Sequence, residues 1–175
     1  MRHLERLPAE SRRLRFGAPF GDEMIARYVD GIDFHRDRVF GVYSLDRRLI
    51  GMAHLALDPT QWFAEIGLSV EPAHRDRGYG HALLQHAIRH AASAGYRTLF
   101  MQCLAENEII KHIAQKSGLE VVTAHGEANA HIALSQEADG VQSANALDGP
   151  PVLIDSVFKR PLASQQILHT ASESS

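Results

Sequence analysis

The feature that most constrains the fold is an apolar segment that leads through a short turn directly into a helical pattern. Residues Phe63–Val70 alternate in the manner of a strand, which Pro72 ends. Beyond the turn at Arg75–Gly80, apolar residues recur at helical spacing as far as Ala94. The first N–H groups of such a helix have no partner within it and lie at the positive end of its dipole. The segment therefore predicts an α/β fold with a site for a phosphate-bearing ligand at this turn.

Two glycines in that turn, Gly78 and Gly80, lack a Cβ, which allows positive φ and lets a phosphate approach the backbone closely. A Rossmann fingerprint is excluded, because Val70 lies eight residues before Gly78 and Leu83 stands where a further glycine is needed. A P-loop is excluded too, since His81 follows Gly80 where the P-loop has lysine. A plain strand-to-helix turn without a ligand remains the alternative.

The rest of the chain predicts a mixed sheet with helices on both faces. Gly95 and Gly118 follow helical segments as C′ residues do, and Gly67 inside a strand indicates a bulge or a close approach of another backbone. The expected helices are Asp22–Asp30 with Asp22 as N-cap, Tyr79–Ala94, and Asn107–Ser117 with Asn107 as N-cap. The expected strands are Val39–Ser44, Leu49–Leu57, Phe63–Val70, Arg97–Leu104 and a weaker pair, Leu119–Ala124 and Ala130–Leu134.

The composition is that of an ordinary globular protein, with 45% hydrophobic and 22% charged residues. A length of 175 residues favours one core, which we place at residues 1–134, followed by a partly disordered tail at 135–175. The apolar piece Val152–Phe158 of this tail is expected to dock on the domain or on a second subunit, as in a homodimer. The net charge of −3 leaves no basic field for nucleic acid.

The single cysteine, Cys103, excludes an intrachain disulfide and favours a reducing compartment, the cytoplasm. We interpret Cys103 as a small buried hydrophobe. No apolar run approaches the ~18 residues of a membrane span, and Met1–Arg13 lacks the apolar core of a signal peptide. No membrane partner is therefore expected.

Two further groups of polar residues stand out. His86 and His90 lie four apart on one predicted helix and could share a metal, but no third ligand is evident, so no metal is expected. Asp30, Asp33 and Asp37 could attract a cationic acceptor. Arginines interleave with them at positions 27, 36 and 38, however, and such a charge run usually marks a solvated face.

The turn at Arg75–Gly80 resembles the acetyl-CoA pyrophosphate loop of the GCN5-related N-acetyltransferases (GNAT), whose pattern is Gln/Arg-x-x-Gly-x-Gly/Ala at the start of a helix. The resemblance extends over Leu7–Leu134 and includes Leu68-Ser69-Val70 before Pro72, and Asn107 followed by Lys116-Ser117-Gly118-Leu119. Within it, three short pieces resemble the catalytic domain of bacterial Pat-type protein-lysine acetyltransferases: Ser11–Phe16, Ala64–Glu65 and Ala105–Asn107.

The resemblance implies a GNAT-like mixed sheet in which the strand ending at Val70 splays from the strand ending at Leu104. The pantetheine arm of acetyl-CoA would lie in that gap and pair with backbone groups near Leu68 and Val70. Its pyrophosphate would sit on N–H groups from Arg75 to Gly80, with Arg75 and Arg77 as nearby positive charge. The implied acetyl-CoA residues are Leu68, Ser69, Val70, Arg75, Asp76, Arg77, Gly78, Tyr79, Gly80, His81 and Asn107.

The same resemblance places the catalytic base at Glu65. A lysine-like amine has a pKa near ~10.4, so a base must remove a proton before the amine can attack a thioester. His54 is a second candidate base. The family often carries a tyrosine that protonates the leaving thiolate, but Ala114 stands at that position here, so no general acid is carried over.

These features predict transfer of acetyl from acetyl-CoA to a primary amine by direct attack. The expected acceptor is a protein lysine, with a small amine such as a polyamine as the alternative. A domain that binds acyl-CoA without catalysis, as a sensor or interaction module, is the competing prediction that the alanine at position 114 favours and Glu65 opposes.

Overall fold

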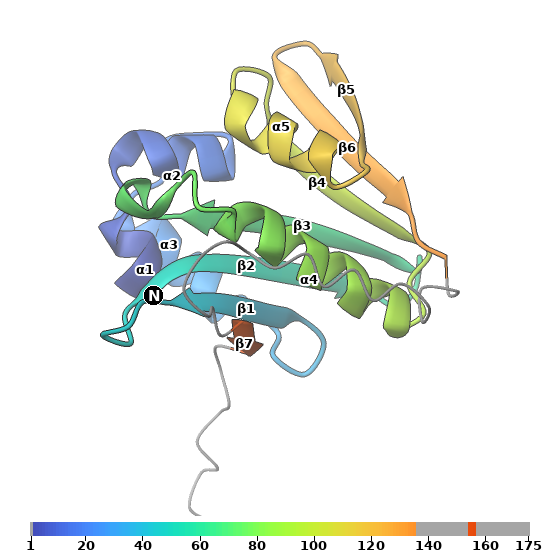
Figure 1. The fold of residues 1–175 in the computed structure, drawn as a ribbon, viewed down its shortest axis with the longest axis horizontal. Helices are drawn as coiled ribbons and strands as arrows, with labels where there is room; N and C mark the ends of the chain where they lie inside the picture. Colours follow the sequence, from blue (N-terminus) through green and yellow to red (C-terminus); the bar gives the residue numbers. More distant parts are fainter. Residues whose placement is uncertain (1, 136–153, 157–175) are drawn as a thin grey trace, which may run out of the picture.

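The computed structural model describes residues 2–135 and 154–156, and its centre is a mixed sheet with strand order β5-β6-β4-β3-β2-β1-β7 (Figure 1). Neighbouring strands run antiparallel except β3 and β4, which are parallel. The strands are β1 (Arg38–Tyr43), β2 (Leu49–Asp58), β3 (Phe63–Val70), β4 (Thr98–Leu104), β5 (Glu120–Ala124), β6 (Glu127–Ala133) and β7 (Ile154–Ser156). The helices are α1 (Arg2–Arg6), α2 (Ala9–Phe16), α3 (Asp22–Asp30), α4 (Tyr79–Ser93) and α5 (Glu108–Lys116), with a 3₁₀ turn, η1 (Pro72–His74).

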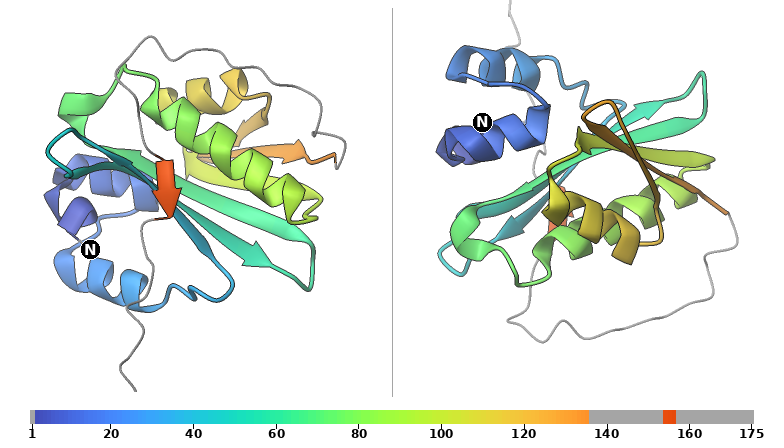
Figure 2. Two further views of the ribbon diagram at one scale, coloured as in Figure 1. Left: turned by 60° about the horizontal axis from the view of Figure 1, so that its bottom comes forward. Right: turned by 90° about the horizontal axis from the view of Figure 1, so that it is seen from above.

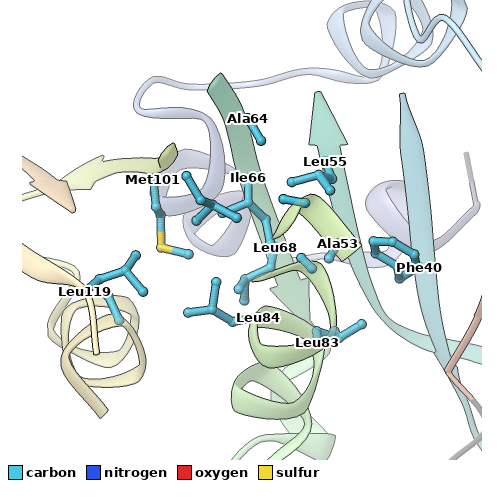
Figure 3. Packing of buried hydrophobic residues seen from close by; sticks show 14 of the residues in the cluster. Phe40, Ala53, Leu55, Ala64, Ile66, Leu68, Leu83, Leu84, Met101 and Leu119 are labelled. Carbon is cyan, nitrogen blue, oxygen red and sulfur yellow. The ribbon is translucent and has the colours of Figure 1, made fainter. Parts of the chain in front are cut away.

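Helices cover both faces of this sheet, which confirms the predicted fold class. Helices α1 to α3 lie on one face, and α4 and α5 lie on the other (Figure 2). The larger core lies under α4, where Ile66 and Leu68 of β3 pack with Leu83 and Leu84 (Figure 3). A smaller core around Leu4 joins α1 and α3 to the opposite face. Both sides of the sheet are therefore buried, as expected for strands rich in apolar residues.

Strands β3 and β4 pair only over their first residues, Phe63–Glu65 with Thr98–Phe100. Beyond Glu65 the two strands diverge, although each keeps its other neighbour: β3 remains paired with β2 as far as Val70, and β4 with β6 as far as Leu104. The predicted splayed pair is confirmed. It leaves one backbone edge of each strand without a partner strand at the centre of the sheet.

Most local signals in the sequence predicted their elements well. The bounds Asp22–Asp30 and Phe63–Val70 match α3 and β3. Asn107 caps α5 by accepting a hydrogen bond from the Ile110 N–H, and Gly95 and Gly118 take positive φ of 84° and 87°. The N-cap assigned to Asp22 was wrong: Gly21 occupies the cap, and Asp22 instead forms an ion pair with Arg12 at 2.6 Å.

The N-terminal helices α1 and α2 were not predicted. Their sequences are short and rich in arginine, so they carry little helical periodicity of their own. Leu4 and Leu7 are nevertheless buried, in the small core that also holds Ile25 of α3. Tertiary burial of a few leucines thus stabilises what local pattern alone does not specify.

Part of the tail extends the sheet, because β7 pairs antiparallel with β1 from Phe40–Ser156 to Val42–Ile154. This strand lies within the apolar piece Val152–Phe158, for which docking was predicted. The predicted disorder of the tail concerns residues 136–153 and 157–175, which lie outside the described residues. Among the described helices, none combines the length and apolarity that a membrane crossing requires.

Candidate active site

A cavity of about 580 Å³ opens where β3 and β4 diverge. This volume is within the ~300–1,000 Å³ typical of small-molecule sites. Its walls come from Leu7, α2, β3, the turn before α4, the start of α4, β4 and α5. It brings together most of the residues predicted to bind acetyl-CoA: Leu68, Ser69, Val70, Arg75, Asp76, Gly78, Tyr79, Gly80, His81 and Asn107.

The edge of β3 offers backbone groups to this cavity. The Glu71 N–H donates to the Ile50 carbonyl at 2.8 Å, so the backbone N–H and C=O groups of odd-numbered residues here point toward β2. The N–H and C=O groups of Leu68 and Val70 therefore point toward the gap, while both side chains pack in the core. The Val70 carbonyl is taken, since Arg75 Nε donates to it at 3.2 Å. The open groups are thus both backbone groups of Leu68 and the N–H of Val70.

The turn before α4 presents a run of N–H groups from Asp76 to His81. None of these donates to a residue in the described part of the chain, and the first helical bond runs from Ala82 N–H to the Gly78 carbonyl at 2.9 Å. Asp76 and Gly78 take positive φ of 58° and 77°, which directs successive N–H groups to one side. The geometry suits a pyrophosphate.

One detail of the predicted turn was wrong. The Arg75 N–H is occupied, because it donates to the Pro72 carbonyl at 3.2 Å. Gly80 lies within α4 and does not use the positive φ that its missing Cβ allows. A Cβ at Gly80 would lie 2.9 Å from Ile113 Cδ1, so this glycine allows α4 and α5 to pack closely beside the cavity.

The charged residues of the turn have different surroundings. Arg75 is tied to the protein, since its guanidinium also donates to Ser11 Oγ of α2 at 2.8 Å. Arg77 is exposed and does not line the cavity. Lys116 at the end of α5 does line it, and its charge was not assigned a role from the sequence. His81 lies 3.0 Å from Ser117 Oγ, and burial followed by the charge of Lys116 lowers the pKa of His81.

Asn107 joins two elements that border the cavity. Its Oδ1 accepts from the Ile110 N–H, and its Nδ2 donates to the Leu14 carbonyl of α2, both at 3.3 Å. Asn107 therefore fixes the start of α5 against α2. Its polar atoms are largely engaged in this role.

Glu65 lies at the vertex of the splay, as the last β3 residue that pairs with β4. Its side chain is exposed and does not line the cavity, but it stands next to Ile66, which does. Its charge acts on Tyr28 and His54, so it lies on the face covered by α1 to α3. Within the described residues Glu65 accepts no side-chain hydrogen bond.

His54 is buried between two polar partners. Its Nδ1 is 2.7 Å from the Tyr28 hydroxyl, and its Nε2 is 3.3 Å from Asp37 Oδ2. Burial lowers the pKa of His54, although Asp37 acts in the opposite direction. Both ring nitrogens of His54 are thus engaged by these two partners.

Asp37 was predicted to belong to a solvated charge run, which was wrong. It is 3% exposed and accepts hydrogen bonds from Arg36, the Leu57 N–H and His54. Burial opposes ionisation, but these three donors leave the pKa of Asp37 below its ordinary value. The interleaved charges therefore include a buried anchor that spacing did not reveal.

Gly67 does not form the predicted bulge, because β2 and β3 keep one register from Phe63 to Val70. A Cβ at this position would coincide with the guanidinium of Arg15. A side chain, not a backbone, makes the close approach. Arg15 itself lines the cavity and was missed as a site residue, although it lies within the family-like stretch Ser11–Phe16.

Three other predicted roles can be compared with the structure. Cys103 is half-buried and lines the cavity, so its assignment to the core was wrong, and burial raises the pKa of its thiol. His86 and His90 both pack on Phe40, with ring centroids 4.6 Å and 5.4 Å away. The described residues contain no group of three potential metal ligands. Ala114 is fully buried and brings no acid to the site.

Comparison with known proteins identifies the family. Residues 4–119 match the acetyltransferase (GNAT) family. The chain belongs to this family. It is accordingly an acetyl-CoA-dependent N-acetyltransferase, with acetyl-CoA as cosubstrate. No curated protein sequence shows significant similarity to it.

Solved structures share the fold of this GNAT protein at low identity. The GNAT domain of S. lividans PAT has a TM-score of 0.64 and 22% identity, covering 76% of this chain and 82% of that one. The spermidine N-acetyltransferase from Vibrio cholerae, in complex with CoA and spermine, has a TM-score of 0.62 and 18% identity, covering 77% of this chain and 88% of that one. A phosphinothricin acetyltransferase from Sinorhizobium meliloti, in complex with AcCoA, has a TM-score of 0.60 and 15% identity, covering 78% of this chain and 88% of that one.

Proposed function

We propose that this enzyme acetylates a protein lysine, in the manner of the bacterial Pat-type acetyltransferases, with Glu65 as the general base. The observation that carries the proposal is the position of Glu65 at the vertex where β3 and β4 diverge, next to Ile66 of the cavity wall. The Pat-like stretch Ser11–Phe16 supports the acceptor class, because it forms α2 beside that vertex.

In this proposal the cavity holds acetyl-CoA. The pyrophosphate binds the N–H groups from Asp76 to His81, near the cation of Lys116. The pantetheine arm pairs with the open backbone groups of Leu68 and Val70. Arg75 and Asn107 act on the cofactor site by fixing the turn and α5 against α2. Ser69 lines the cavity, but its backbone groups face β2 and its hydroxyl is bound by His3 at 2.9 Å, so it offers acetyl-CoA no open polar group.

The reaction is a direct transfer without a covalent enzyme intermediate. Glu65 accepts one proton from the lysine ammonium, directly or through one water, and the free amine attacks the thioester carbonyl carbon. A C–N bond forms, the C–S bond breaks, and the electron pair leaves with the CoA sulfur. The second amine proton passes to solvent. With Ala114 at the acid position, water protonates a thiolate whose pKa near ~8.5 makes it a tolerable leaving group.

The mechanism is tested by Glu65→Gln. We expect acetyl-CoA affinity to stay unchanged while kcat/KM falls by roughly 10²–10⁴-fold, the usual contribution of a positioned base. The acidic limb of the wild-type pH–rate profile should vanish, because glutamine does not titrate. Mass spectrometry of acetylated products from a lysate, a peptide set and an amine panel identifies the acceptor. Full activity of Glu65→Gln would show that another residue is the base. Wild type that binds acetyl-CoA but transfers no acetyl group would favour the acyl-CoA sensor.

The cofactor site is tested by Gly80→Val. The new side chain must displace Ile113 and disturb the packing of α4 on α5 at the cavity. We expect acetyl-CoA binding to weaken by well over tenfold, which calorimetry measures. Circular dichroism and a melting curve of the unliganded variant establish that it is folded. Unchanged affinity in a folded variant would contradict the assignment.

The polyamine alternative is supported by the fold shared with the Vibrio cholerae enzyme, whose structure contains CoA and spermine. The amine panel distinguishes it from lysine acetylation. The cytoplasmic location and a homodimer stay predictions, the first resting on the single cysteine and the second on the tail.

A further inference from the structure

Helix α2 carries three arginines with different surroundings. Arg12 forms an ion pair with Asp22 at 2.6 Å, and Arg13 forms ion pairs with Glu10 and Glu106, each at 2.7 Å. Arg15 has no carboxylate within ion-pair distance among the described residues. It is the arginine of this helix that lines the cavity. A cation without an ion-pair partner among the described residues is thus placed at the site.

The guanidinium of Arg15 lies over β3 at Gly67, in the space that any other side chain there would fill. Its Cζ is 4.8 Å from the ring centre of Phe16 and 5.8 Å from that of Tyr28, so two aromatic rings flank the cation. Nη2 donates to the Tyr28 hydroxyl at 3.1 Å, while the buried Nε has no hydrogen-bond partner. Much of its donor capacity remains for a ligand.

A buried chain of hydrogen bonds holds this guanidinium in place. Asp37 accepts the Nε2 proton of His54, which leaves Nδ1 as the acceptor for the Tyr28 hydroxyl proton. The Tyr28 oxygen is then turned toward Arg15 and accepts from it. Each partner of Arg15 in this chain is neutral, so the chain orients the cation without neutralising it. At the far end of this hydrogen-bonded chain, the Asp37 carboxylate is already bound by Arg36.

We propose that Arg15 binds a carboxylate carried by the acceptor close to its reactive amine. Glu65 and Gly67 are two residues apart on one face of β3, about 7 Å along the strand. An acceptor can therefore place its ammonium at Glu65 and its carboxylate at Arg15. This proposal rests on the proposed function, and it narrows the acceptor to a zwitterion-like group: an amino acid, or a lysine beside an acidic residue. A polycationic acceptor would meet repulsion at the same position.

The test uses matched pairs of acceptors that differ only in this charge. One pair is a lysine peptide with aspartate beside the lysine and the same peptide with asparagine; the other is a free amino acid and its amide. The ratio of kcat/KM within each pair is measured for wild type, Arg15→Gln and Tyr28→Phe. Arg13→Gln is the matched control, because Arg13 lies on the same helix and is paired outside the cavity.

We expect wild type and Arg13→Gln to prefer the carboxylate member of at least one pair by roughly 10- to 100-fold, as a charge-assisted hydrogen bond provides. Arg15→Gln should reduce that ratio to near unity, and Tyr28→Phe should reduce it partly. The pair that shows the preference identifies the source of the carboxylate. A wild-type ratio near unity, or a ratio that Arg15→Gln leaves unchanged, overturns the proposal.

A binding measurement separates this result from failure of the proposed function. Calorimetry of the same pairs on CoA-loaded protein needs no turnover. If wild type acetylates none of the amines, the proposed function fails, while tighter binding of the carboxylate members that Arg15→Gln abolishes still supports the anion site. If Arg15→Gln melts like wild type and binds each member of a pair with the affinity of wild type, the anion site is refuted.

Discussion

Two polar clusters lie under the helices on the same face of the sheet, and they treat their buried charge in opposite ways. Around Glu71, Arg6 and Arg48 each bind one carboxylate oxygen at 2.8 Å, with His3 at 3.8 Å. Around Arg15, Tyr28 is the hydrogen-bond partner that the described residues supply. Both oxygens of the Glu71 carboxylate are bound within the fold, whereas the Arg15 guanidinium has one hydrogen-bond partner there.

The difference separates structural from functional charge. A buried carboxylate is costly unless it is paired. The pairs of Glu71 with Arg6 and Arg48 join the end of β3 to α1 and to the β1–β2 connection. A cation held by neutral groups contributes little to holding elements together. Arg15 is placed at the cavity wall by a chain that ends at Asp37, and its free donors suit a ligand. The first cluster should control stability, and the second should control acceptor choice.

The largest effect is expected for Glu71→Gln. Loss of the buried carboxylate leaves Arg6 and Arg48 without their counter-charge. The free energy of unfolding should fall by roughly 3 kcal/mol, the low end of the range for breaking a buried ion pair, because both arginines are partly exposed. Urea unfolding measures it. Glu10→Gln is the control, a surface pair whose loss should hardly change stability. A small effect at Glu71, or a changed acceptor ratio, would remove the distinction between the clusters.

The next effect is a dependence of stability on pH that comes from His3. Burial lowers the pKa of His3 from 6.5 to about 4, although the Leu49 carbonyl and Glu71 act the other way. The unfolded chain therefore binds a proton that the folded chain does not, so this contribution is complete above pH 6.5 and is lost as pH falls toward 4. Between pH 7 and pH 5 it amounts to about 2 kcal/mol.

The measurement is urea unfolding of wild type and His3→Gln across that pH range. The other buried histidines titrate equally in both proteins, so the difference between the two curves isolates His3. If the stability of the two proteins changes equally with pH, the pKa of His3 is the same in the folded and the unfolded chain. The Glu71 cluster is then less closed to solvent than its geometry indicates.

A smaller effect, confined to the second cluster, is expected for Gly67→Ala. The added Cβ occupies the place of the Arg15 guanidinium, which must swing away. The acceptor preference should fall by about tenfold, as for loss of one charge-assisted bond. The double variant with Arg15→Gln should show no further loss, because both changes remove one contact. Additive losses in the double variant would mean that Gly67 serves the site in another way.

The smallest effect is expected for removal of residues 136–175. This truncation deletes β7, a three-residue edge strand that pairs with β1, and removes no residue of either cluster. We expect a cooperative melt, unchanged acetyl-CoA affinity and an unchanged acceptor ratio. Loss of folding by circular dichroism would make the tail part of the core, and would contradict a domain that ends near residue 134.

The sequence alone determined the elements around the cofactor site. The strand Phe63–Val70, the turn with Gly78 and the helix after it follow from signals within a few residues of one another: alternation, a proline stop, a glycine and a helical stripe. Asn107 could be identified as a cap for the same reason, because capping joins a side chain to an N–H three residues away.

Only the tertiary structure decided what the polar side chains do. Arg75 matched the family motif, yet its guanidinium is tied to Ser11 of α2. Gly67 looked like a bulge and proved to make room for Arg15, and Asp37 looked solvated and proved buried. Each of these outcomes depends on contacts between residues far apart in the chain. Local propensity carries no record of which helix will cover which strand, so burial and partner choice emerge only once the sheet and its helices are assembled.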